Sequence, residues 1–334
     1  MLRGLSTNCF VVVWPEDLIV SDMMSKVMGS TVIQRGYNFY LGAWNTITSR
    51  YPIGTNVFEN EWDVLILLDT CRVDALQSVA SEYDFLTNVE SLISVGSTSS
   101  EWIANTFREE YLDEINNTAY VTGNGHSQRV LSNQVYPDPQ YQTPGWPIKK
   151  AFVHERDLLL LDQPWAYVEE DEPGHVSADA VTDRTISVGR EYDWDRIIVH
   201  YSQPHSPYVS NAIKEDRDLF PYEDDPFPEL REGNVSKDVV WEAYISELHA
   251  VLESVETLLR NIDAANVAIS ADHGEAFGEW RMYGHVQGML HPDVKVVPWA
   301  ETSAEDTHTV EPEIDHSDEE IQSMKEQLEA LGYK

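Results

Sequence analysis

The stretch Val267-Ala-Ile-Ser-Ala-Asp-His-Gly-Glu-Ala-Phe-Gly-Glu-Trp-Arg-Met-Tyr-Gly-His285 decides the fold. The apolar run at 267–269 predicts a buried strand, and the chain then reaches a carboxylate and an imidazole, Asp272 and His273. Gly274 follows, and glycine permits a sharp turn that lets the backbone approach a ligand. Open α/β sheets bind ligands at the carboxyl ends of their strands. The stretch therefore predicts a site at this strand end, to which His285 could return as a second imidazole.

Two more apolar runs end in polar residues of the same kind. The run at 64–68 predicts a strand that ends in Asp69, and the run that begins at Ile197 continues into a loop with Pro204 and His205. Between them lies a turn rich in hydroxyls, Gly96-Ser-Thr-Ser99. Carboxylates, imidazoles and a hydroxyl turn at strand ends together predict a metal-assisted nucleophilic site.

These motifs, in this order, resemble the sulfatase branch of the alkaline-phosphatase superfamily. The resemblance rests on Leu-Leu-Asp69-Thr-Cys-Arg72-Val-Asp74, Pro204-His205-Ser-Pro-Tyr208, Asp272-His-Gly-Glu275 and Gly284-His285. The turn at 96–99 is similar to the threonine-nucleophile turn of lipoteichoic acid synthases in that superfamily. The closing Leu328-Glu-Ala-Leu-Gly-Tyr333 is similar to the tail of many sulfatase-like chains. The resemblance therefore extends from about residue 60 to the C-terminus, and it implies a three-layer αβα fold with a mostly parallel central sheet.

The resemblance implies that Asp69, Asp272 and His273 bind a divalent metal, with Thr98 as the fourth ligand and the nucleophile. Ser97 and Ser99 are competing hydroxyls. Hard oxygen ligands with one imidazole favour Mn²⁺ or Zn²⁺, with Mg²⁺ or Ca²⁺ as alternatives. We expect one metal, because Gln203 stands where many relatives carry an aspartate.

Three further side chains are expected to meet the substrate. His205 and His285 would bind non-bridging oxygens and protonate the leaving group, which suits an imidazole near pH 7. Arg72 would bind the anion, although Asp74 or Glu275 could equally pair with it.

The expected reaction is hydrolysis of a phosphate or sulfate ester through Thr98. The Cys-x-Pro-Ser-Arg motif, whose cysteine becomes formylglycine in sulfatases, is missing from the sequence. A phosphoester is therefore the favoured substrate. The alternatives are a non-catalytic binding member of the fold and a phosphoryl transferase acting on a glycan or a lipid-linked substrate.

The composition limits partners and location. Aspartate and glutamate number 58 against 22 lysines and arginines, which gives a formal charge of −36. This excess disfavours nucleic acid as a partner and predicts a halophilic, cytoplasmic protein, kept in solution by its carboxylates in concentrated salt. We expect a small-molecule or glycan ester as substrate. No apolar run is long enough for a membrane span. The two cysteines imply no disulfide framework. The sequence leaves the oligomeric state open.

The expected domains are an N-terminal helical extension at 1–54, a catalytic domain at 55–300, and an acidic linker with a C-terminal helix at 301–334. Within the catalytic domain, helices alternate with short apolar strands, which is typical of a parallel sheet covered on both faces. The expected strands are 64–68, 119–122, 196–202 and 294–299, and the expected helices are 73–82, 100–110, 177–192, 235–261 and 318–331.

Overall fold

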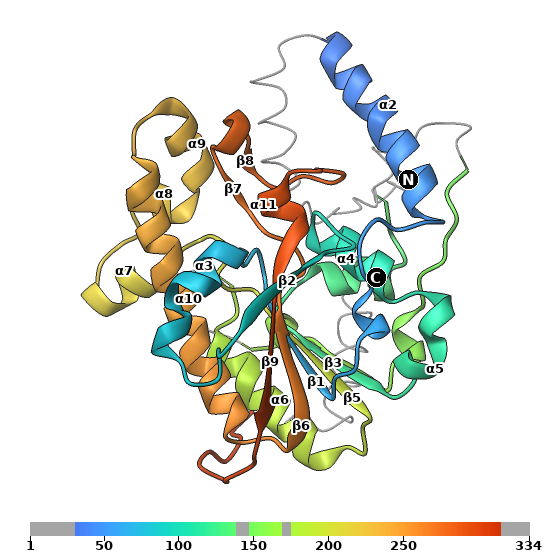
Figure 1. Ribbon diagram of the computed structural model, residues 1–334, viewed down its shortest axis with the longest axis vertical. Coiled ribbons are helices and arrows are strands. Elements are labelled where there is room, and N and C mark those ends of the chain that lie inside the picture. The colour runs from blue at the N-terminus through green and yellow to red at the C-terminus, as the bar shows by residue number, and fades with distance from the viewer. Residues whose placement is uncertain (1–30, 138–146, 169–174, 315–334) are drawn as a thin grey trace, which may run out of the picture.

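A seven-stranded sheet forms the centre of the molecule in this computed structural model, which describes residues 31–137, 147–168 and 175–314 (Figure 1). The sheet order is β2-β9-β6-β1-β5-β3-β4. Strands β6, β1, β5, β3 and β4 pair in parallel, whereas β9 is antiparallel to both β2 and β6. The strands are β1 (Val64–Leu68), β2 (Val89–Ile93), β3 (Thr118–Thr122), β4 (Leu160–Asp162), β5 (Arg196–Tyr201), β6 (Ala264–Ser270) and β9 (Val296–Ala304), and a separate hairpin joins β7 (Ala276–Phe277) to β8 (Tyr283–Gly284).

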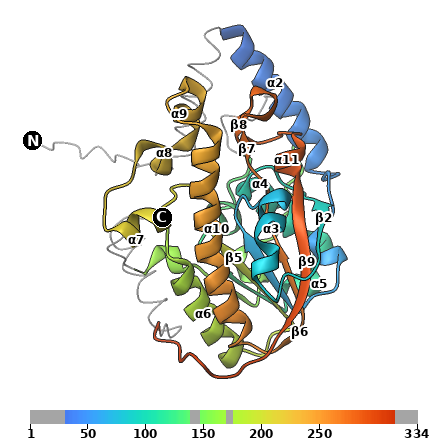
Figure 2. The same ribbon diagram turned by 60° about the vertical axis from the view of Figure 1, so that its left-hand side comes forward.

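Helices cover both faces of the sheet, as Figures 1 and 2 show from two sides. On one face lie α3 (Val73–Val79), α6 (Ala178–Glu191) and α10 (Lys237–Leu259), and on the other lie α4 (Ser99–Thr106) and α5 (Leu112–Ile115). The remaining helices are α2 (Thr31–Thr48), α7 (Ser210–Glu215), α8 (Pro221–Asp224), α9 (Pro226–Glu232) and α11 (Pro292–Lys295).

The alternation of side chains along β1 explains the three layers. Val64, Ile66 and Leu68 belong to the apolar cluster under α3, α6 and α10, whereas Leu65 and Leu67 belong to the cluster under α4. Successive side chains of a strand point to opposite faces of the sheet, so a fully apolar strand must be covered on both. The predicted three-layer α/β architecture with a mostly parallel sheet is confirmed.

The C-terminal part of the sheet differs from the expected elements. The last strand was expected at 294–299, but a short helix, α11, occupies 292–295 and β9 extends to Ala304. The expected domain limit at residue 300 therefore falls inside a strand. The predicted helix at 318–331 lies outside the described residues, and the domain limits stay predictions.

Candidate metal and nucleophile site

The carboxyl ends of β1 and β6 bring Asp69, Asp272 and His273 together. β1 and β6 are parallel neighbours, so the residues that follow them meet at one edge of the sheet. Nε2 of His273 lies 3.6 Å from Oδ1 of Asp69 and 3.4 Å from Oδ2 of Asp272. All three side chains are buried, and one ligand atom from each lies within 4.8 Å of the others.

The backbone around Gly274 fixes how His273 presents its ring. A Cβ at position 274 would lie 2.1 Å from the carbonyl oxygen of Asp293, so only glycine fits there. Nδ1 of His273 donates to the carbonyl of Gly274 at 3.0 Å, which leaves Nε2 to face the two carboxylates. Burial lowers the pKa of His273 to about 4 despite the nearby Asp272. A neutral imidazole with this tautomer is the form that binds a metal.

The hydroxyl that reaches this group belongs to Ser99. Its Oγ lies 3.4 Å from Oδ2 of Asp69 and 3.4 Å from Nε2 of His273. Thr98 is instead the N-cap of α4, where its Oγ1 accepts the N–H of Glu101 at 3.3 Å. Oγ of Ser97 donates to the Glu101 carboxylate at 2.6 Å. The structure thus places Thr98 beside the site and Ser99 in it.

Asn124 joins the site without having been predicted. Its Nδ2 donates to Oδ2 of Asp69 at 2.8 Å. Asn124 follows β3, the neighbour of β5, and so reaches the same edge of the sheet. The signal in the sequence was its position in a glycine-flanked loop directly after an apolar run.

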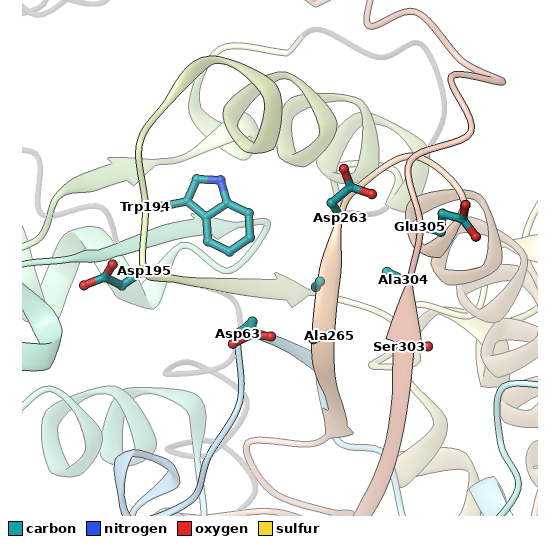
Figure 3. A pocket seen from close by; sticks show the side chains of 9 residues that line it. Asp63, Trp194, Asp195, Asp263, Ala265, Ser303, Ala304 and Glu305 are labelled. Atoms are coloured by element: carbon teal, nitrogen blue, oxygen red, sulfur yellow. The ribbon is translucent and has the colours of Figure 1, made fainter.

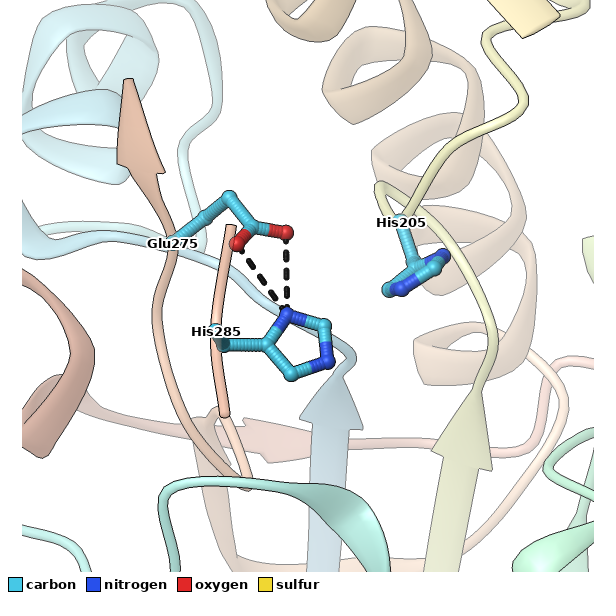
Figure 4. A group of neighbouring side chains, drawn as sticks. All are labelled: His205, Glu275 and His285. Atoms are coloured by element: carbon cyan, nitrogen blue, oxygen red, sulfur yellow. Dashed lines mark hydrogen bonds and ion pairs between the residues drawn. The ribbon is translucent and has the colours of Figure 1, made fainter. Parts of the chain in front are cut away.

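A second group lies beside the first and consists of His205, Glu275 and His285 (Figure 4). Nδ1 of His285 lies 3.1 Å from both oxygens of Glu275, so the carboxylate orients the ring with Nε2 on the far side. The ring centroids of His285 and His273 are 4.2 Å apart, and those of His285 and His205 are 5.4 Å apart. The structure therefore brings both predicted histidines to the site and adds Glu275, which the sequence interpretation had considered only as a partner of Arg72.

Arg72 lies in an ion-pair network of its own. It donates to Asp74 at 2.7 and 2.8 Å, to Glu279 at 3.0 Å and to the carbonyl of Glu275 at 3.1 Å. Its guanidinium also lies 5.0 Å from the ring centroid of Trp241. Arg72 thus contacts Asp74 on α3, Asp293 on α11, the hairpin β7–β8 and helix α10, and its expected role in substrate binding stays a prediction.

The chemistry of the donors fits a divalent cation. Asp69 and Asp272 place two carboxylates in a buried space with one neutral imidazole, and burying like charges without a counter-ion is costly. Burial by itself would raise the pKa of Asp272, but His273, His200 and Ser99 lower it well below its usual value. Two carboxylates, an imidazole and a hydroxyl form a set that Mn²⁺ and Zn²⁺ accept.

An acidic pocket lies at the opposite edge of the sheet (Figure 3). Asp63, Asp195 and Asp263 line it just before β1, β5 and β6 begin, together with Trp194 and Glu305. Because the strands are parallel, this pocket is a full strand length away from the site at their carboxyl ends. Its residues do not contribute to the metal group.

Comparisons with known proteins give structural similarity only. No protein-family model matches the chain, and no curated protein matches it. The soluble domain of lipooligosaccharide phosphoethanolamine transferase A from Neisseria meningitidis is 13% identical over 72% of this chain and 75% of that chain, with a TM-score of 0.42. The periplasmic domain of phosphoethanolamine transferase EptC from Campylobacter jejuni is 13% identical over 79% and 82%, with a TM-score of 0.41.

A protein of the alkaline phosphatase superfamily from Vibrio parahaemolyticus is 11% identical over 74% of this chain and 61% of that chain, with a TM-score of 0.40. Such values describe a backbone arrangement that is shared in part, so the chemistry of the site rests on its own residues. Within the described residues, no helix combines the length and the apolar character that crossing a bilayer requires.

Proposed function

We propose that this protein is a metal-dependent enzyme that cleaves a phosphoester through a hydroxyl nucleophile at the start of α4. The observation that carries the proposal is the position of Ser99, whose Oγ lies 3.4 Å from both Asp69 and His273. A serine hydroxyl has a high pKa and needs activation before it attacks. A hydroxyl beside two buried carboxylates and a neutral imidazole has the surroundings in which a bound cation would supply that activation.

The proposed ligands of the single metal are Asp69, Asp272 and His273, with the nucleophile hydroxyl as the fourth. Mn²⁺ and Zn²⁺ are the favoured ions. When bound, the metal would lower the pKa of the hydroxyl and offset negative charge on the substrate.

Ser99 is the favoured nucleophile because of its distances, and Thr98 is the alternative that the motif suggests. The hydroxyl of Thr98 already accepts a backbone N–H as the cap of α4, and such a cap is worth about 1 kcal/mol. This bond uses one of the two lone pairs of the Thr98 oxygen, whereas the Ser99 hydroxyl lies at Asp69 and His273 without serving as the cap.

His205 and His285 are proposed to act on the leaving group. Glu275 fixes the ring of His285, and an oriented imidazole next to the nucleophile can give a proton to the departing alcohol oxygen. In the proposed reaction Ser99 loses its proton to solvent and attacks phosphorus, the bond to the leaving oxygen breaks, and a phosphoserine results. Water, or an alcohol in a transferase, then loses a proton and attacks the phosphorus of this intermediate, the bond from phosphorus to Oγ of Ser99 breaks, and Oγ regains a proton.

The nucleophile chemistry favours phosphorus over sulfur. A formylglycine hydrate can expel sulfate with its second hydroxyl, but a serine or threonine has only one hydroxyl. A sulfate ester on Ser99 or Thr98 would depend on slow attack at sulfur. We therefore expect turnover of an aryl phosphodiester or phosphonate ester, and little turnover of an aryl sulfate.

The test compares Ser99→Ala, Thr98→Ala and Ser97→Ala, each loaded with Mn²⁺ in molar salt. We expect Ser99→Ala to lower kcat by about 10³-fold or more, and Thr98→Ala to lower stability by about 1 kcal/mol while keeping most activity. Mass spectrometry of enzyme quenched during turnover should locate the phosphoryl group on Ser99. A phosphoryl group on Thr98 would reassign the nucleophile, and aryl sulfatase activity that survives all three changes would end the proposal.

A further inference from the structure

A buried tyrosine and a buried histidine lie directly behind the metal group. The phenol oxygen of Tyr120, on β3, is 2.9 Å from Nδ1 of His200, on β5. Nε2 of His200 is 3.5 Å from Oδ2 of Asp272. Tyr120, His200 and Asp272 are each 0% exposed, so these contacts do not compete with solvent.

The packing leaves the ring of His200 little freedom. The ring of Trp102, on α4, meets it edge to face at a centroid distance of 5.7 Å. The ring of Tyr120 stacks on it at 6.2 Å. The direction of Nε2 is therefore set by the core of the sheet and not by a mobile loop.

The hydrogen-bond donors and acceptors around His200 determine which of its ring nitrogens carries the proton. Burial raises the pKa of the Tyr120 phenol, so the phenol keeps its proton and can donate it to Nδ1. The hydrogen of a neutral imidazole is then on Nε2, facing Asp272. The opposite tautomer would direct a lone pair at the Asp272 carboxylate, which is unfavourable because, unlike Nε2 of His273, Nε2 of His200 is not among the proposed metal ligands and would have no cation to bind.

The carboxylate of Asp272 has room for this donor. Its Oδ1 accepts the N–H groups of His273 at 2.8 Å and of Thr70 at 3.4 Å. Among the described residues, neither Oδ2 of Asp272 nor Nε2 of His200 has a hydrogen-bond partner, and the 3.5 Å between the two atoms is longer than an ordinary hydrogen bond. Since buried polar atoms are nearly always paired, these two atoms are the natural partners of each other. A carboxylate oxygen has two acceptor positions, which leaves one on Oδ2 for a metal.

We propose that His200 is a positioning residue for the metal site: held by Tyr120, it donates Nε2–H to Oδ2 of Asp272 and fixes the orientation of that carboxylate. The inference rests on the proposed function, because it assumes that Asp272 binds a metal. Residues that hydrogen-bond to a metal-binding side chain, without touching the metal, typically contribute about 10- to 100-fold to metal affinity.

The test measures Mn²⁺ affinity by calorimetry and the coordination of the ion by the EPR spectrum of bound Mn²⁺, in wild type and in variants of His200 and Tyr120. His200→Leu removes the donor and should weaken Mn²⁺ binding by about 10- to 100-fold and broaden the spectrum. His200→Gln places an amide nitrogen near the position of Nε2 and should restore most of the affinity. Tyr120→Phe, which frees the tautomer, should give an intermediate loss.

The chain offers a matched control in the pair Tyr83 and His249. Their phenol oxygen and Nδ1 are also 2.9 Å apart, but His249 lies on α10, outside the site. His249→Leu and Tyr83→Phe should leave Mn²⁺ affinity and the EPR spectrum unchanged.

The outcomes separate this inference from the proposed function. Wild-type protein that binds no Mn²⁺ would overturn the metal site and with it the role of His200. Wild-type protein that binds Mn²⁺ while His200→Leu binds it equally well would overturn the inference alone. If His200→Leu does not fold, the variants His200→Gln and Tyr120→Phe decide the question. A lower Mn²⁺ affinity in Tyr120→Phe, together with an affinity close to wild type in His200→Gln, supports the inference. Equal Mn²⁺ affinity in wild type and Tyr120→Phe overturns it.

Discussion

The carboxylate of Asp272 is held from several sides, which makes it the residue on which the site depends. Two backbone N–H groups bind Oδ1, while the imidazoles of His273 and His200 lie 3.4 and 3.5 Å from Oδ2. Its neighbour Asp69 is also buried, so the metal-free protein confines two carboxylates with no cation between them. A bound divalent ion would convert this repulsion into attraction.

Replacing Asp272 with asparagine tests whether repulsion between the two buried carboxylates destabilises the metal-free protein and whether Asp272 binds the metal. The amide keeps the shape of the side chain and removes one buried charge, so metal-free Asp272→Asn should unfold at a temperature equal to or above that of metal-free wild type. Mn²⁺ at 100 times its Kd should stabilise wild type by about 2.7 kcal/mol, and it should leave the variant unaffected. Thermal unfolding with and without metal measures both effects. A variant that gains as much from Mn²⁺ as wild type would remove Asp272 from the ligand set.

His285 provides a test of how many metals the site holds. If one ion is bound by Asp69, Asp272 and His273, then His285→Ala should keep one Mn²⁺ per chain and lose turnover by about 10²- to 10⁴-fold, the usual contribution of a general acid. Metal content by mass spectrometry and kinetics on the same sample check this. A second ion in wild type that His285→Ala and Glu275→Gln both lose would show that His205, Glu275 and His285 form a metal site of their own.

At the scale of elements, three parallel strands in the middle of the sheet, β1, β3 and β5, could be predicted almost residue by residue, whereas of β6 only the apolar run 267–269 was expected. β1 was expected at 64–68 and is found there, and β5 at 196–201 was expected at 196–202. Strands that are buried on both faces are apolar throughout, so they stand out from their surroundings. Their carboxyl ends could then be predicted to meet, which is why the sequence grouped Asp69, Asp272 and His273, whose side chains lie together in the structure; their role as metal ligands stays a prediction.

Strands at the exposed side of the sheet could not be predicted in the same way. The five residues of β2 are all partly buried or exposed, and the second half of β9 likewise contains no fully buried residue. Such segments resemble loops in hydropathy. The sequence named Ser99 as a competing hydroxyl and placed Asn124 in a glycine-flanked loop, but it could not show that both side chains reach Asp69, because this depends on how a turn orients one side chain relative to the next.

The hairpin β7–β8 is attached to the domain through Glu279. Its carboxylate accepts the N–H of Phe277 at 2.6 Å and a hydrogen bond from Arg72 at 3.0 Å, and it also pairs with Lys237. Burial by itself would raise the pKa of Glu279, but the hydrogen bond from Lys237, a backbone hydrogen bond, and the charge and hydrogen bond of Arg72 lower it from 4.5 to about 2. A carboxylate whose pKa is lowered by folding stabilises the folded state above its unfolded pKa, and this contribution disappears as pH falls towards the folded pKa.

Glu279→Gln should therefore be less stable than wild type at pH 7, and the difference should shrink as pH falls from about 4.5 towards 2. Urea unfolding at pH 7, 5, 4 and 3.5 in constant salt measures the difference in free energy of unfolding. Exposed Glu61 supplies the control, since Glu61→Gln should differ little from wild type at any of these values. A difference for Glu279→Gln that stays constant down to pH 3.5 would contradict the pairing.

At the scale of the whole molecule, the site lies at one end of the sheet, beneath the elements seen at the top of Figure 1. Helix α2 contacts the loop that follows His285: the hydroxyl of Tyr37 donates to the carbonyl of Gln287 at 3.2 Å, and Gln287 donates to Asn45 at 2.7 Å. The N-terminal helix thus supports the loop that carries a proposed catalytic residue. This contact joins the expected extension at 1–54 to the site.

The net charge of −36 acts on the molecule as a whole and predicts a dependence on salt. Repulsion among surface carboxylates extends about 10 Å at 0.1 M salt and about 3 Å at 1 M, so concentrated KCl should favour the folded state. Because the entropy of unfolding is about 2.1 cal/mol/K per residue, a gain of about 3 kcal/mol would raise the Tm of this chain of 334 residues by roughly 4 °C. Thermal unfolding of metal-free protein between 0.1 and 3 M KCl measures this.

A charge-reduced variant separates screening from other effects of salt. Glu61, Glu82 and Glu109 are exposed, and the triple glutamate-to-glutamine variant removes three like charges without touching the core. If repulsion sets the salt requirement, this variant should have a higher Tm than wild type at 0.1 M KCl, and the two should converge at 3 M because screening removes the advantage. Sucrose at matched osmolality should not reproduce the convergence, since it leaves charges unscreened. A Tm difference that is the same at 0.1 and 3 M KCl would show that the salt acts on something other than surface charge.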